Sequence, residues 1–147
     1  MRMTICIILA SAALLANASD THSQAHRDHA GEVLDQCGEY SQAGMRDCLE
    51  KKVGESAAAL AKADGRTLTA IRQWDEDPKF AAQAEAKLRA SASDFAKYRA
   101  AQCAFVTSLG GGAIGSALEL RRLACVFAMN TQRLQELTRL AAELPKK

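Results

Sequence analysis

The chain has 147 residues and is 48% hydrophobic and 24% charged, with 19 basic residues against 17 acidic ones. This length suits one domain, or one domain with a processed leader. The formal net charge of +2 is too close to neutral for recruitment to nucleic acid or to a membrane surface by bulk charge. Alanine is abundant and proline occurs only twice, which favours helices and argues against a collagen-like, mucin-like or fully disordered chain.

Residues 1–18 predict a secretory signal peptide. Arg2 gives the segment a positive start, and an apolar run over 4–15 follows that is too short to span the ~30 Å hydrocarbon core of a bilayer. The run leads to Ala16-Asn17-Ala18, a small-residue cleavage pattern, so we expect cleavage after Ala18. The alternative is a short buried helix at the N-terminus. We therefore expect a periplasmic or secreted protein with no membrane insertion once the leader is removed.

Residues 19–36 are polar and show no sustained hydrophobic period, so we interpret them as a flexible lead-in. They contain all three histidines of the chain, His22, His26 and His29, and two of the gaps suit neighbours on a helix. A weak metal site is the alternative, but no cysteine or other fixed ligand accompanies the histidines. We expect no metal and no cofactor.

The remaining segment, residues 37–147, is expected to form one all-α domain, an antiparallel bundle of three helices without a sheet. Apolar residues recur there at steps of three and four over about 42–74, about 78–109, and from Ser116 onward. The first stripe contains Met45, Leu49, Val53, Ala57, Leu60, Asp64, Leu68 and Ile71. The second contains Phe80, Ala84, Leu88, Ala92, Phe95, Tyr98, Gln102 and Phe105. The third contains Leu120, Leu123, Phe127, Asn130, Leu134, Leu137, Ala141 and Leu144.

Local signals mark the ends of these helices. Asp77 suits the cap of the second helix and Pro78 its first turn, and the glycines at 110–112 end that helix. Ser116, with Glu119 three residues later, predicts a capping box for the third helix. Short turns between long helices make them antiparallel neighbours.

Four cysteines remain after leader cleavage: Cys37, Cys48, Cys103 and Cys125. An even number in an exported chain predicts two disulfides, and the spacings of 11, 55 and 22 residues argue against the close pairs of a zinc site. Cys103 and Cys125 both lie about 9–14 Å from the glycine turn at helical rise, nearly level across the hairpin. Of the three connectivities we favour Cys37–Cys48 with Cys103–Cys125.

Nothing in the sequence predicts an enzyme. The histidines are confined to the lead-in, four bridged cysteines leave no thiol nucleophile, and the glycine-rich 110–116 lacks the lysine and the preceding strand of a phosphate loop. Arg121 and Arg122, beside the glycine turn, form either a solvated helix face or a surface that recognises carboxylates. Arg99, next to the apolar stripe, suggests a structural partner for a buried acid or a helix end.

An ordered set of residues resembles a known family. The set is Cys37, Met45 and Cys48, then Phe95, Tyr98, Arg99 and Cys103, then Gly115 and Ser116, then Cys125, and finally Arg133 within Thr131–Leu137. In this order it resembles the LprI-like lysozyme-inhibitor family of small exported bacterial proteins, over roughly residues 37–140.

The resemblance implies a mainly helical envelope protein that binds and inhibits lysozyme. Lysozyme cleaves glycan through two carboxylates, so an inhibitor need only occlude that cleft. We look for the contact at Arg121 and Arg122, because the motif residues themselves suggest structural roles. The expected partner is therefore a protein, lysozyme or another peptidoglycan hydrolase. The alternative is a non-catalytic structural or adaptor module of the cell envelope with another protein partner.

Overall fold

The computed structural model describes residues 18–146, with side chains from residue 28 onward. The predicted leader lies outside the described residues, except for Ala18. Four helices make up the described part: α1 (Ala18–Cys37), α2 (Gln42–Arg72), α3 (Pro78–Ser108) and α4 (Gly115–Glu143). No strand occurs among them, and a single isolated bridge joins Trp74 to Lys146. The expected all-α fold is confirmed.

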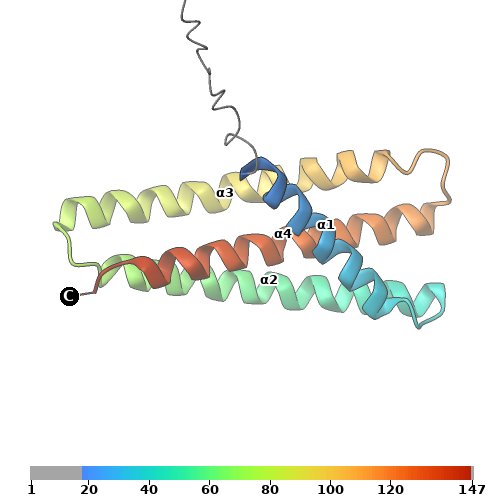
Figure 1. The fold of residues 1–147 in the computed structure, drawn as a ribbon, viewed down its shortest axis with the longest axis horizontal. Helices are drawn as coiled ribbons and strands as arrows, with labels where there is room; N and C mark the ends of the chain where they lie inside the picture. Colours follow the sequence, from blue (N-terminus) through green and yellow to red (C-terminus); the bar gives the residue numbers. More distant parts are fainter. Residues whose placement is uncertain (1–17, 147) are drawn as a thin grey trace, which may run out of the picture.

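Three long helices lie alongside one another, and α1 crosses them obliquely (Figure 1). The α1–α2 and α3–α4 turns lie at one end of the bundle, and the α2–α3 turn and the C-terminus lie at the other (Figure 1). We call the first of these the double-turn end. Helices α2 and α4 each contact the other three helices, and the most extensive contact in the bundle is the one between these two.

The expectation of three helices and a flexible lead-in over 19–36 is wrong, because that segment forms most of α1. Among its described side chains, the apolar ones lie in the last two turns, where Ala30, Val33, Leu34 and Cys37 fall on one helical face. Val33 and Cys37 are fully buried against Leu49 and neighbours on α4. Because the rest of residues 19–36 is polar, a stripe of two turns gives no clear helical period in the sequence.

The core consists of three clusters along the bundle. At the double-turn end, α1, α2 and α4 bury Val33, Cys37, Leu49, Leu123 and Ala124. Further along, Leu60, Ala63 and Leu137 join α2 to α4. Cys103, Cys125 and Met129 join α3 to α4. Full burial of one leucine or valine stabilises the fold by about 1.5–3 kcal/mol.

Helix α3 follows the predicted stripe only in part. Phe80, Tyr98 and Phe105 were expected in the core, but they are 45%, 58% and 57% exposed. Cys103 is the one side chain of α3 that is fully buried. Leu88 and Phe95 of the predicted stripe do pack inward, whereas toward the C-terminus of the helix Cys103 and Val106 take the place of Phe105.

The ends of the helices follow the local signals in part. The Asp77 carboxylate accepts a hydrogen bond from the Lys79 N–H at 2.8 Å, and Pro78 begins α3, as predicted. The predicted capping box is wrong: α4 begins at Gly115, and no side chain bonds to its free N–H groups. The Glu119 carboxylate, which that motif would have used, instead binds an arginine on its own helix.

Both disulfides have the pairing that the sequence favours. Cys37 is bonded to Cys48 with a Cα–Cα distance of 5.8 Å, and Cys103 to Cys125 with a Cα–Cα distance of 5.6 Å. The first bond ties the C-terminus of α1 to α2, and the second ties α3 to α4. Both crosslinks therefore hold the double-turn end, where the residues of interest for function gather.

Candidate functional site

Arg99 is part of a buried polar network between three helices. Its Nη1 donates a hydrogen bond to Asn130 Oδ1, and Asn130 Nδ2 donates to Ser56 Oγ at 2.9 Å. Ser56 Oγ in turn donates to the Val53 carbonyl at 2.9 Å. Asn130 is fully buried, so these bonds replace the water its amide has lost. Arg99 thus has a structural partner, which is an amide on α4 and not an acid.

Phe95 lies beside this network and under two guanidinium groups. The Cζ atoms of Arg99 and Arg133 lie 5.6 and 5.2 Å from its ring centroid. Arg133 also donates a hydrogen bond to Ser91 Oγ at 2.9 Å. Phe95, Arg99 and Arg133 therefore form one cluster in which cation–π contacts hold α3 to α4.

Asp64 is the one charged residue of the predicted α2 stripe, and it points inward. Its Oδ1 is buried and makes no hydrogen bond. Burial raises the pKa of this carboxyl, and the positive charge of Arg133 partly opposes that increase. The charge that acts on this carboxyl is the guanidinium of Arg133, which also belongs to the Phe95 cluster.

The other motif residues lie apart from this cluster. Met45 packs against the core cluster at the double-turn end. Tyr98 is exposed, Gly115 begins α4, and Ser116 is exposed. The motif residues thus do not converge on one site.

The two arginines beside the glycine turn have different surroundings. Arg122 binds Glu119 through two hydrogen bonds, Nε to Oε2 at 2.8 Å and Nη2 to Oε1 at 2.6 Å. These bonds raise the pKa of Arg122 and lower that of Glu119. Arg121 is exposed, and no hydrogen bond or ion pair joins its guanidinium to any residue in the described range. Of the pair, Arg121 is the one with donors free for a partner.

Large apolar side chains are exposed at the α3–α4 turn, and the Arg121 guanidinium lies near Gly110 of the same turn. Phe105, Leu109 and Ile114 are 57%, 64% and 66% exposed. We call these three side chains with Arg121 the turn surface. Sequence reasoning missed Leu109 and Ile114, although two bulky apolar residues flanking three glycines in a turn are an unusual signal for an exposed contact.

Behind the turn surface, a groove of about 430 Å³ opens between α1, α3 and α4. Its lining residues are Ala30, Leu34, Met45, Val106, Ala117, Leu120, Arg121, Ala124 and Cys125. We call it the α1–α3–α4 groove. Arg121 is the only charged residue of this lining within 28–146, so the described groove is apolar with one cation.

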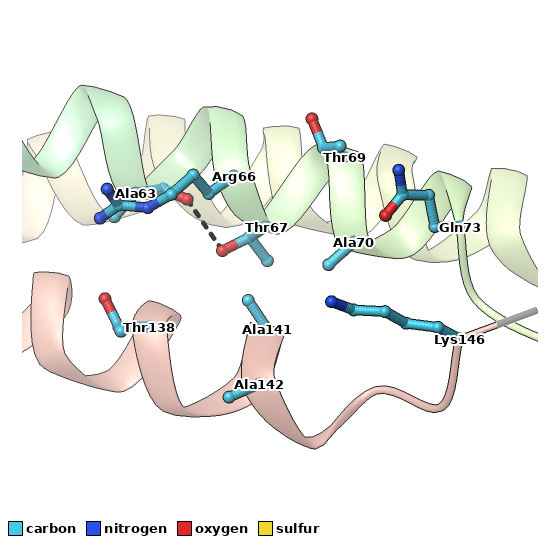
Figure 2. Close-up of a pocket in the computed structure, with 10 residues that line it drawn as sticks. All are labelled: Ala63, Arg66, Thr67, Thr69, Ala70, Gln73, Thr138, Ala141, Ala142 and Lys146. Carbon is cyan, nitrogen blue, oxygen red and sulfur yellow. Dashed lines mark hydrogen bonds between the residues drawn. The ribbon is translucent and has the colours of Figure 1, made fainter.

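Two other hollows are more polar. One, of about 350 Å³, lies between α2 and α4 over alanines, with the side chains of Arg66, Gln73 and Lys146 around it (Figure 2). The Thr67 hydroxyl in it donates to the Ala63 carbonyl at 2.9 Å, and is thereby held by backbone (Figure 2). The other, of about 710 Å³, lies where α1 meets α2 and contains both carboxylates and lysines.

Neither a metal centre nor a membrane-spanning segment is found in the described part. Within 18–146, no three histidine, cysteine, aspartate or glutamate side chains are grouped to hold a metal. His29 Nε2 lies 3.3 Å from Gln135 Oε1 and Nδ1 lies 3.7 Å from Glu32, whereas the side chains of His22 and His26 are outside the described residues. None of α1–α4 combines the length and hydropathy needed to cross a bilayer.

Comparison with known proteins identifies the family. A family model described as "Lysozyme inhibitor LprI" matches residues 35–137, which include both disulfides, the Arg99 network and the α3–α4 turn. No curated protein and no solved structure matches the chain. Because the family model covers well over half of its length, the chain belongs to the lysozyme inhibitor LprI family.

Proposed function

We propose that this protein is an exported inhibitor that binds lysozyme through the turn surface and covers the cleft in which the enzyme holds its glycan. Membership in the family supports the inhibitor role. The observation that supports the choice of site is the α3–α4 turn, which exposes three large apolar side chains and lies beside an arginine that has no ion-pair partner among the described residues. Such clusters of exposed apolar and arginine side chains are typical of protein contact sites.

Arg121 gives this surface a chemical match to the enzyme. A guanidinium can hold a carboxylate through two parallel hydrogen bonds, and the catalytic groups of lysozyme are two carboxylates. The glycines at 110–112 keep the turn narrow, which suits entry into a cleft. The inhibitor would act by occlusion and would need no chemistry of its own.

Charge at the same end of the bundle favours the encounter. Residues 28–55, around the α1–α2 turn, contain seven acidic and three basic side chains. Lysozyme is usually strongly basic, so this local negative field would steer it toward the double-turn end even though the whole chain is nearly neutral. Export fits the leader pattern in 1–18 and the two disulfides, which persist in oxidising compartments such as the periplasm or the extracellular space.

The test is lysozyme activity on a cell-wall suspension with the purified, oxidised protein added. We expect slower clearing that saturates with protein concentration. No slowing at a large molar excess would refute the inhibitor role and would leave the alternative of a structural or adaptor module of the envelope.

The site is tested separately with variants. We expect Arg121→Gln and Leu109→Ser to weaken inhibition, each by about tenfold. Leu140→Ser is the matched control, because Leu140 is also exposed, at 41%, but lies near the other end of α4. If the double variant Arg121→Ala/Arg122→Ala inhibits as well as the parent protein, the turn surface is not the contact.

A further inference from the structure

We propose that the α1–α3–α4 groove is a binding site for a small anionic amphiphile, a molecule with one aliphatic chain and a negatively charged head. The chain would lie along the apolar walls, and the head would meet Arg121. This inference concerns a ligand of the protein alone and does not depend on lysozyme inhibition.

The lining of the groove is suited to an aliphatic chain. Ala124 and Cys125 are buried at its floor, and Leu34, Val106 and Leu120 are half-buried in its walls. Each wall comes from a different helix, α1, α3 or α4. Removing water from half-buried aliphatic side chains around a concave space is favourable in free energy. A flexible hydrocarbon chain can fill that space and displace the water.

The charge of the groove determines which head group of an amphiphile it can bind. Among the residues whose side chains the structure describes, Arg121 is the only charged one in the lining, and its guanidinium has no acidic partner there. Arg122, one residue along, is neutralised by Glu119 and does not line the groove. One unpaired cation at an apolar groove favours a carboxylate, sulfate or phosphate head over a neutral or a cationic one.

The shape of the groove favours a small molecule over a protein segment. Its volume of about 430 Å³ lies within the range of about 300–1,000 Å³ of small-molecule sites. Helix α1 forms one wall and is fixed in place by the Cys37–Cys48 bond and the buried Val33. A stable protein interface buries about 800 Å² of surface on each partner, an area that suits the broader turn surface outside the groove.

The experiment is calorimetric titration of the purified, oxidised full chain after leader removal, with dodecanoate, dodecyl sulfate, dodecylammonium and dodecanol below their micelle concentrations. We expect the two anionic probes to bind at one molecule per chain, and dodecylammonium and dodecanol to bind at least about tenfold more weakly. Octanoate is expected to bind more weakly than dodecanoate, because it buries less apolar surface.

Variants assign the binding to the groove. Arg121→Gln is expected to weaken dodecanoate about tenfold, whereas Arg122→Gln, the matched neighbour, is expected to leave it unchanged. Ala117→Trp, at an exposed lining position, is expected to fill the groove and abolish binding while the far-ultraviolet circular dichroism stays that of the parent.

Three results would overturn the proposal. The first is no saturable binding of either anionic probe to a folded chain. The second is equal binding of anionic and cationic probes, or equal binding by parent and Ala117→Trp proteins, which would indicate detergent-like adsorption. The third is a dimer that dissociates as dodecanoate binds, so that the affinity for dodecanoate falls as the protein concentration rises. That result would assign the groove to a second copy of the chain. Lysozyme inhibition is measured separately, so either proposal can fail alone.

Discussion

Replacing Asn130 by leucine tests whether the buried polar network stabilises the bundle. Leucine matches asparagine in the number and branching of its side-chain heavy atoms, so the substitution removes the amide without leaving a cavity. It removes the bond from Arg99, which is charge-assisted, and the bond to Ser56, which is neutral. Bonds of these kinds contribute about 1.5–3 and about 0.5–1.5 kcal/mol, so we expect the free energy of unfolding to fall by about 2–4 kcal/mol.

The assay is urea unfolding followed by circular dichroism, supported by a Tm that we expect to be lower by about 10 °C. A double-mutant cycle with Arg99→Met separates the pair from its surroundings. Both single variants break the same bond, so the double variant should cost at least about 1 kcal/mol less than the sum of the singles. Ser91→Ala is the control, since it removes an arginine bond at an exposed residue and should cost under about 1 kcal/mol. An Asn130→Leu protein within about 0.5 kcal/mol of the parent, or additive singles, would refute the reasoning.

Three further predictions concern a crosslink, a turn and a surface charge. Replacing Cys37 and Cys48 by serine should lower the free energy of unfolding by about 3 kcal/mol, from the loop of 11 residues that the bond closes, as measured by urea unfolding. Gly111→Ala should cost about 1 kcal/mol because Gly111 has φ +55°, whereas Gly112→Ala, at an open position with ordinary φ, should be nearly neutral; equal Tm values for the two would contradict this. Hydrogen bonds from arginines on α2 and α3 lower the pKa of Glu85 to about 2, so its contribution to stability is present above pH 4.5 and is lost as the pH falls toward 2. Glu85→Gln should therefore be less stable than the parent at pH 6 and equal to it near pH 2, and a constant difference in Tm across that range would exclude the effect.

The features that could be predicted from the sequence depend on local chemistry. A proline after a capping aspartate begins α3, and a run of glycines ends it, whatever the rest of the chain does. The Cys103–Cys125 bond follows from equal distances to one turn, and it needs no knowledge of the core. Long repeats of apolar residues also locate α2 and α4, because many turns contribute to the same period.

The features that could not be predicted depend on neighbours. Helix α1 has apolar residues over only two turns, and these become meaningful only when α2 and α4 supply the facing side chains. The buried face of α3 departs from the predicted stripe at Phe80, Tyr98 and Phe105 because alanines line much of that helix, so several faces are almost equally apolar and tertiary contacts decide among them. The difference between Arg121 and Arg122, in contrast, is local: Glu119 lies three residues before Arg122 on the same helix and faces it, whereas it lies two residues before Arg121 and does not.

The distribution of stabilising contacts also bears on where a partner can bind. At the double-turn end two disulfides, a fully buried cluster and close contact between the turn and α4 hold the backbone, so Leu109, Ile114 and Arg121 extend from a rigid base. The other end relies more on exposed ion pairs such as Arg72–Glu85, each of which contributes little in water. A rigid base lowers the entropy lost when exposed side chains become ordered in a complex, and it also keeps the groove open in the absence of a ligand. Rigidity at the double-turn end therefore favours both the turn surface and the groove as binding sites over any hollow at the opposite end.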